Sequence, residues 1–287
     1  MAEALAHGIE VIPTGAALGA EIRGLDVRAV DRETFEAIRT VWHRHLVVVF
    51  RDQDLAGDLS RFSRWFGELD PAPVDTRGMP SIPEHPEIAV ISNIIEDGEP
   101  IGALGAYEAA WHTDMSYRAE PPSASLLFAL EVPEEGGDTG FANMYLACEE
   151  LPAALRDRAE GRAIKHDASH DSAGQLRRGV EAPANPGEAP GVSHPIIRTH
   201  PATGREALFL GRRRNAYVDG LPSAASEALL DALWAFATRP EFTWHHQWAP
   251  GDLVVWDNRC TLHRRDAFDA DARRLMLRTQ VKGSRPV

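Results

Sequence analysis

Trp111-His112-Thr113-Asp114 is the most informative stretch of this chain, and it has a counterpart far along the sequence, Trp256-Asp257-Asn258-Arg259-Cys260-Thr261-Leu262-His263. Both stretches have the composition of β-strands. Alternating residues of a strand point to the same face, so His112 and Asp114 can reach one ion. His263 would add a second imidazole. The spacing therefore predicts a metal site made of His112, Asp114 and His263 on a framework of strands.

The donor set of this site indicates which metal it would hold. Two imidazoles and one carboxylate on one face of a metal leave up to three coordination positions open, which is the arrangement of non-haem iron(II) oxygenases. Structural zinc sites use four protein ligands, often thiolates, and the two stretches offer no such set. The sequence thus favours iron(II).

Thr139 and Arg274 are candidates for binding an α-ketoacid cosubstrate. Such a molecule chelates iron through its ketoacid end and directs a second carboxylate away from the metal. A planar guanidinium matches a carboxylate with two parallel hydrogen bonds, and a threonine hydroxyl adds another donor. Arg274 lies on the predicted strand after His263, and Arg278 shares its facing by even spacing. Arg278 is therefore a candidate for binding an anionic group of the substrate.

The pattern along the rest of the chain predicts a mainly β protein with helices. Asp31 is a plausible N-cap for an amphipathic helix over 32–45, and further helices are expected over 59–66, 145–160 and 222–239. Many short strands, with helices at the start and inserted later, predict a jelly-roll-like double sheet with helical buttresses. The expected strands span 9–13, 20–27, 46–50, 88–92, 123–131, 242–248, 253–256 and 273–281.

Bulk properties set limits on domain count and partners. At 287 residues the chain fits one domain, 1–287, as all-β folds with helical decoration often reach this size. The net charge of −13 argues against a nucleic-acid or anionic-membrane surface, because phosphate binding needs a basic field. It does not exclude a small anionic substrate, since arginines at the site can make the local charge positive although the net charge is negative.

The two cysteines and the first residues indicate a cytoplasmic protein. Cys148 and Cys260 lie far apart, and without a recognisable secretory signal we interpret them as reduced buried thiols. No apolar run is long enough to span a bilayer. Cys148 has no evident histidine partner, so nucleophilic catalysis is poorly supported. The run Arg212-Arg213-Arg214 fits a solvated loop better than a phosphate site.

Taken together, these motifs resemble the family of taurine dioxygenase and 2,4-dichlorophenoxyacetate dioxygenase, which are iron(II)- and 2-oxoglutarate-dependent oxygenases. The likeness covers nearly the whole chain. Its blocks are Phe50-Arg51-Asp52-Gln53, Phe66-Gly67-Glu68-Leu69, Trp111-His112-Thr113-Asp114, Gly136-Gly137-Asp138-Thr139, Arg198-Thr199-His200-Pro201, Trp256 through His263 and the terminal arginine strand.

The resemblance implies a double-stranded β-helix and a set of roles. His112, Asp114 and His263 would bind Fe(II), while Thr139 and Arg274 would hold the distal carboxylate of 2-oxoglutarate. The reaction with O2 would hydroxylate an sp³ carbon and release succinate and CO2. Related halogenases replace the metal-binding carboxylate with a small residue, so Asp114 favours hydroxylation.

The chain departs from the taurine enzymes at the expected substrate site. Ala72 stands before Pro73-Val74 where those enzymes typically have a sulfonate-binding histidine, and Asp75 replaces the usual aromatic residue. Glu108 stands where they tend to have asparagine. Two carboxylates would oppose a sulfonate, so we expect a small carboxylate, such as an amino acid derivative or an aryloxyalkanoate, anchored by Arg278.

Other interpretations remain open on the sequence alone. They are a taurine dioxygenase proper, a zinc hydrolase with the same three ligands, and a non-catalytic jelly-roll binding protein. A homo-oligomer, dimer or tetramer, is plausible. The proline-rich segment 179–191 has the composition of a mobile loop, and whether it closes over a substrate is a separate question.

Overall fold

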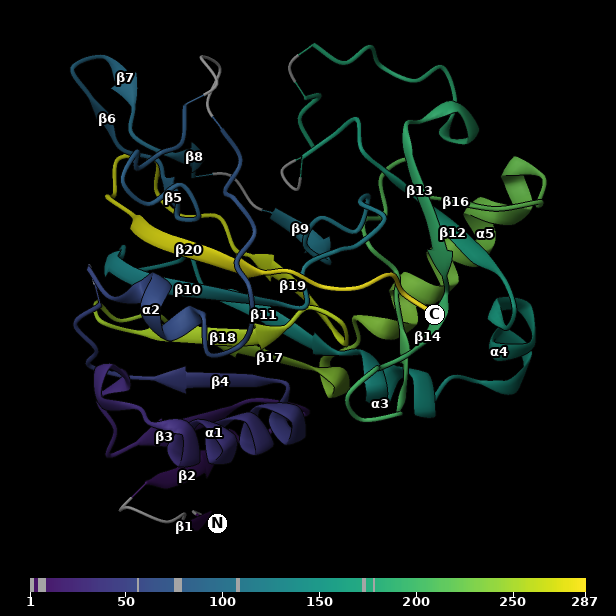
Figure 1. Ribbon diagram of the computed structural model, residues 1–287. Coiled ribbons are helices and arrows are strands. Elements are labelled where there is room, and N and C mark those ends of the chain that lie inside the picture. The colour runs from purple at the N-terminus through teal and green to yellow at the C-terminus, as the bar shows by residue number, and fades with distance from the viewer. Residues whose placement is uncertain are drawn as a thin grey trace.

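The computed structural model describes residues 3–4, 9–55, 57–74, 79–106, 109–171, 174–177 and 179–287 (Figure 1). Strands dominate, and helices lie at the start of the chain and between later strands (Figure 1). The predicted class, mainly β with helices, is confirmed. No helix in the described part of the chain is both long and apolar enough to cross a membrane.

The largest sheet runs through the middle of the molecule. Its neighbouring strands are antiparallel except for the pairs β3–β4 and β5–β8, which are parallel. In spatial order its strands are β1 (Glu3–Ala4), β2 (Glu10–Pro13), β3 (Ala20–Arg23), β4 (Val47–Phe50), β18 (Leu253–Asp257), β10 (Ala124–Glu131), β20 (Leu275–Val281), β5 (Ala89–Ser92) and β8 (Ala103–Leu104).

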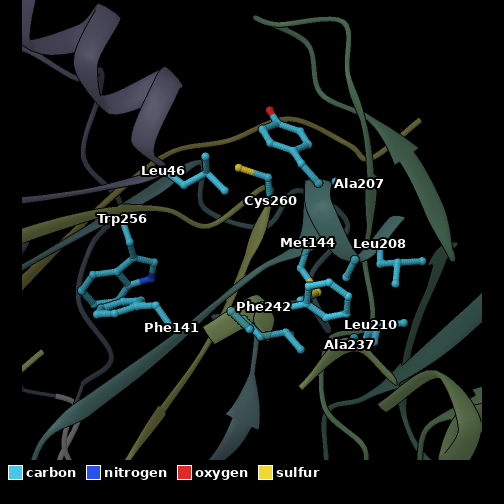
Figure 2. Close-up of a cluster of buried hydrophobic side chains, with 14 of the residues drawn as sticks. Leu46, Phe141, Met144, Ala207, Leu208, Leu210, Ala237, Phe242, Trp256 and Cys260 are labelled. Atoms are coloured by element: carbon cyan, nitrogen blue, oxygen red, sulfur yellow. The ribbon is translucent and has the colours of Figure 1, made fainter. Parts of the chain in front are cut away.

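A second, smaller sheet packs against the middle of the first. Its order is β17 (Thr243–His246), β11 (Thr139–Asn143), β19 (Thr261–Arg265) and β9 (Ala109–His112). Phe141 of β11 contacts Trp256 of β18, with ring centroids 5.6 Å apart (Figure 2). The two sheets therefore share a core, and they bring the two tryptophan-rich stretches together.

The central strands β4 and β18 of the large sheet are buried on both faces, as their continuous apolar runs predict. In β18 the side chains of Val254 and Trp256 enter the core between the sheets, while Leu253 and Val255 enter a second core on the opposite face. The side chains of strand β4 alternate between the same two cores. The period of two along a strand thus explains why these runs contain no polar break.

Helices α1 (Arg32–His45) and α2 (Leu59–Ser63) cover the second core. The Asp31 side chain accepts a hydrogen bond from the Thr34 amide, as predicted for an N-cap, and α1 ends at Leu46 in a left-handed conformation. Helix α2 ends earlier than expected, at Ser63, because the next residues form isolated turns.

The helix expected over 145–160 is two helices, α3 (Met144–Glu149) and α4 (Ala153–Ala159). Pro152 separates them, because proline disfavours a helical conformation in the residue before it. Helix α5 (Ser223–Ala237) packs against both and closes the first core. Figure 2 shows Met144, Ala237 and Phe242 meeting there. Both cysteines are buried free thiols, as predicted.

The remaining strands form three small sheets beside this framework. The segment 179–191 contains one 3₁₀ turn, Pro186–Glu188. The sheets are β12 (Ala163–Asp167) with β13 (Gly191–Pro195) and β16 (Tyr217–Val218), β14 (Ile197–Thr199) with β15 (Glu206–Leu208), and β6 (Ile95–Glu96) with β7 (Glu99–Pro100).

Candidate active site

Three predicted metal ligands meet at the edge of the small sheet. His112, the last residue of β9, pairs directly with His263 of β19, and their ring centroids are 4.1 Å apart. The Asp114 Oδ1 atom lies 3.7 Å from His112 Nε2 and 3.8 Å from His263 Nε2. All three side chains are buried. One potential ligand atom from each converges on a common point, so the group has the geometry to hold a metal ion.

Asp114 reaches this point in a different way from the one predicted. Strand β9 ends at His112, so Asp114 lies in the following turn rather than on the strand. Met115 has a positive φ of 46°, and the Thr113 amide donates to the Gly211 carbonyl over 3.0 Å. The turn, and not strand alternation, brings the carboxylate back beside the imidazoles.

Buried hydrogen bonds fix the orientation of the Asp114 carboxylate. The Ser125 hydroxyl donates to Asp114 Oδ2 over 2.8 Å and accepts from Gln280 Nε2 over 3.1 Å. The Asn258 side chain binds the Asp114 backbone at both its amide and its carbonyl. Because Oδ2 is held, Oδ1 is the oxygen that faces His112 and His263. Such outer contacts orient metal ligands in proteins.

The protonation states also suit a metal. His112 Nδ1 lies 2.8 Å from the Ala110 carbonyl, which fixes Nδ1 as the donor and leaves the Nε2 lone pair free. Burial and the neighbouring His112 lower the pKa of His263 to about 3, so its ring is neutral. Burial alone would raise the pKa of Asp114, but the Arg278 guanidinium and the contacts with the two imidazoles keep it well below its usual value. A carboxylate whose oxygen converges with two imidazole nitrogens fits a divalent cation.

Thr139 and Arg274, the residues predicted to bind the cosubstrate, line one small cavity beside this group. The cavity is about 50 Å³ and is also lined by His263, Leu127 and Trp256. The Thr139 hydroxyl accepts a hydrogen bond from Trp248 Nε1 over 2.9 Å, so its own hydrogen is free to be donated.

The Arg274 guanidinium is deeply buried in this cavity. The residue is only 2% exposed, and its Nε atom has no hydrogen-bond partner. Burial, together with the nearby Arg265, lowers the pKa of Arg274 to about 9. A buried cation is costly unless an anion accompanies it. The cavity therefore favours an anionic ligand.

Arg265 is a further arginine of this cavity that the sequence analysis missed. It pairs across the strands with Thr139, and burial lowers its pKa to about 10. The signal was present, because Arg265 follows His263 by two residues and such residues share a strand face.

Arg278 lines this small cavity and also a second one. Its Nη1 atom is 3.6 Å from Asp114 Oδ1, and both residues line a second cavity of about 330 Å³. Arg212 lines this cavity too, although the triple-arginine run was interpreted as a solvated loop. That interpretation is wrong for Arg212, because Gly211 has a φ of 70° and turns the chain beside His112. Two predicted substrate residues, Asp75 and Glu108, lie outside the described residues.

A second group of potential ligands, His200, Asp257 and Cys260, is already satisfied by the protein. The Arg259 guanidinium binds both oxygens of Asp257, over 2.8 and 2.7 Å, and His200 Nε2 lies 3.0 Å from the same carboxylate. Burial raises the pKa of the Cys260 thiol well above its usual value. This group anchors the end of β18, and so positions the turn that leads to His263.

Comparison with known proteins identifies the family. The model described as "Taurine catabolism dioxygenase TauD, TfdA family" matches residues 10–280. The chain belongs to this family. This confirms the predicted resemblance and makes the protein an enzyme of the dioxygenase class.

Individual TauD/TfdA relatives agree with this placement. The α-ketoglutarate-dependent 2,4-dichlorophenoxyacetate dioxygenase of Burkholderia sp. (strain RASC) is 36% identical over 247 residues, covering 83% of this chain and 82% of that protein. A taurine dioxygenase crystal structure from Burkholderia xenovorans has a TM-score of 0.76 at 33% identity, covering 97% and 92% of the two chains. The structure of AAD-2 in complex with Mn(II) and N-oxalylglycine has a TM-score of 0.77 at 28% identity, covering 97% and 98%.

Proposed function

We propose that this protein is an iron(II)- and 2-oxoglutarate-dependent dioxygenase that hydroxylates an sp³ carbon of a small anionic substrate and releases succinate and CO2. The observation that carries the proposal is the convergence of His112 Nε2, His263 Nε2 and Asp114 Oδ1 beside an arginine-lined cavity. The α-ketoglutarate dependence of a relative and the Mn(II) in the AAD-2 structure support it.

The metal would be held by the three converging side chains. His112 and His263 would give neutral nitrogen lone pairs, and Asp114 would give one carboxylate oxygen while Ser125 holds the other. This leaves the open positions that an oxygenase needs. When bound, iron(II) and 2-oxoglutarate supply, together with O2, the oxidative decarboxylation that drives hydroxylation.

The cosubstrate would extend from the metal into the small cavity. Arg274 would bind its distal carboxylate through parallel hydrogen bonds, and the Thr139 hydroxyl would donate a further one. Burial of Arg274 strengthens these bonds because little water competes for the guanidinium. The apolar walls formed by Ile91, Leu127 and Trp256 exclude water from the rest of the pocket.

The substrate would occupy the larger cavity, with an anionic group at Arg278. This arginine is close enough to Asp114 that a small molecule bound to it lies beside the metal. A carboxylate such as an aryloxyalkanoate suits the cavity, and the substrate named for the Burkholderia relative belongs to that class. If Arg278→Ala left KM for the true substrate unchanged, this assignment would be wrong.

We further propose a specific fold and a single domain for this chain. The two facing sheets form the core of a double-stranded β-helix, and residues 1–287 make up a single domain. Support comes from the shared core between the sheets and from TM-scores of 0.76 and 0.77 over 97% of the chain.

Oxygen-dependent conversion of 2-oxoglutarate to succinate tests the function. The protein, supplied with iron(II), ascorbate and 2,4-dichlorophenoxyacetate as probe substrate, should form succinate in air and none under nitrogen. His263→Ala should abolish turnover, whereas His245→Ala, a matched change of an exposed histidine on β17, should not. Hydrolysis that survives without oxygen would favour the zinc hydrolase instead, and a binding protein would consume no 2-oxoglutarate.

A further inference from the structure

Three arginines line the cavity next to Asp114. They are Arg278, which lies near Asp114, and Arg212 and Arg177, which line the cavity together with Tyr117. Its volume, about 330 Å³, is near the lower end of the range for small-molecule sites. The three guanidinium groups make the cavity locally positive, although the chain as a whole has a net charge of −13.

Arg212 and Arg177 form a pair. Arg212 Nη1 donates to the His170 carbonyl over 2.8 Å, and Arg177 Nε donates to the same oxygen over 3.2 Å. Both guanidinium groups also lie against the Tyr117 ring, 5.5 and 4.6 Å from its centroid. One neutral carbonyl and one aromatic ring therefore bring two positive charges together.

This arrangement is electrostatically unfavourable without a further anion. Burial, and the positive charge of Arg177, lower the pKa of Arg212. The Arg212 Nε atom is buried without a hydrogen-bond partner. Like charges near each other in a low-dielectric site repel, and a bound anion would remove that repulsion.

The acidic residues of the cavity do not balance the arginines. Among the described residues that line it, only Asp114 and Asp171 are acidic. Under the proposed function Asp114 binds the metal, so the single negative charge of Asp171 remains to balance the positive charges of three guanidinium groups. The excess is two positive charges, one of which Arg278 would use for the first anionic group of the substrate.

We propose that Arg212 and Arg177 form a second anion subsite and that the substrate is a small organic dianion. One oxyanion group, such as a carboxylate, binds Arg278, and the other binds the Arg212–Arg177 pair, with the reacting carbon held between them beside the metal ligands. This rests on the proposed function, because it assigns Asp114 to the metal. It narrows the substrate class from anions in general to molecules with two anionic groups.

A matched pair of probes tests the subsite. Phenoxyacetate carries one carboxylate and 4-carboxyphenoxyacetate carries two. Each is titrated by calorimetry into the protein loaded with iron(II) and saturating 2-oxoglutarate without oxygen, so that neither probe occupies the cosubstrate pocket. We expect the dianion to bind about 10-fold to 100-fold more tightly, as for a charge-assisted hydrogen bond.

Three variants test whether the preference for the dianion comes from Arg212 and Arg177. Arg212→Gln and Arg177→Gln should each reduce it to about twofold or less, and the second variant carries the test if the first does not fold. Arg213→Gln is the control, because Arg213 forms ion pairs with Glu227 and Asp231 of α5. It should keep the full preference.

The outcomes separate this inference from the proposed function. Equal affinities of the two probes, no binding of the dianion at millimolar concentration, or a preference that survives in both variants would overturn the subsite. The visible absorption of the loaded protein reports the metal and cosubstrate independently. If that absorption fails to form, the proposed function fails, while calorimetry on the Arg212→Gln and Arg177→Gln variants still decides whether the arginine pair selects a dianion.

Discussion

Replacing Ser125 with alanine is predicted to weaken metal binding without removing a metal ligand. The Ser125 hydroxyl is fully buried and holds Asp114 Oδ2 over 2.8 Å. Without it, the carboxylate is free to rotate, and Arg278 Nη1, 3.6 Å from Oδ1, competes for the oxygen that faces the two imidazoles. The Gln280 amide also loses its acceptor, 3.1 Å away.

The expected size of this effect follows from the contact that is lost. A hydrogen bond to a charged group contributes about 1.5–3 kcal/mol, which corresponds to a weakening of metal affinity by about 10-fold to 100-fold. We expect this range for the dissociation constant of Mn(II), which avoids iron oxidation, measured by calorimetry on Ser125→Ala.

Ser226→Ala is the matched control for Ser125→Ala. Its hydroxyl is equally buried and accepts a hydrogen bond from the Val218 amide over 2.9 Å, but it lies on α5, outside the site. It should lose thermal stability and keep its Mn(II) affinity. Unchanged Mn(II) affinity in Ser125→Ala would refute the argument that this hydroxyl orients Asp114.

Three further predictions follow from contacts and charges elsewhere in the molecule. Arg274→Lys should raise KM for 2-oxoglutarate about 10-fold to 100-fold, because an ammonium group cannot form two parallel hydrogen bonds; steady-state kinetics would check this, and an unchanged KM would contradict it. Gly211→Ala should lower the free energy of unfolding, measured with urea, by about 2–5 kcal/mol, because the added Cβ would lie 1.7 Å from His166 Nδ1. Gly161→Ala is the control: its φ is similar and nothing lies within 4 Å of the added Cβ, so it should lower the free energy of unfolding less. The free energy of unfolding of the metal-free protein should decrease as the pH drops below 6.5. In that range His263 is protonated in the unfolded chain but stays neutral in the folded protein, where its pKa is about 3. At pH 5 this single group should account for about 2 kcal/mol, and His263→Ala should show a correspondingly smaller loss between pH 7 and pH 5.

Much of the fold could be predicted because local signals agree with the final packing. In the run over 46–50, residues 47–50 form a strand buried on both faces, and their side chains alternate between two cores. Asp31 caps the first helix as expected. The prediction was wrong over 145–160, where apolar periodicity continues through Pro152 although the backbone cannot stay helical there.

The sequence indicated which residues form the candidate site, but not how the backbone brings them together. His112, Asp114 and His263 do converge, but Asp114 does so through a turn that alternation along a strand does not describe. Arg212 was missed for a related reason. A run of arginines has the composition of a solvated loop, and only the path of the chain at Gly211 directs one of them inward. Such turns depend on tertiary contacts that local sequence patterns do not encode.

The most direct test of the whole account is a visible spectrum recorded without oxygen. Iron(II) and 2-oxoglutarate added to the metal-free protein should produce the metal-to-ligand charge-transfer band of a chelated ketoacid. The band should be lost in both His263→Ala and Arg274→Ala. Iron that binds without producing the band would mean that the metal site is real and the cosubstrate assignment is wrong.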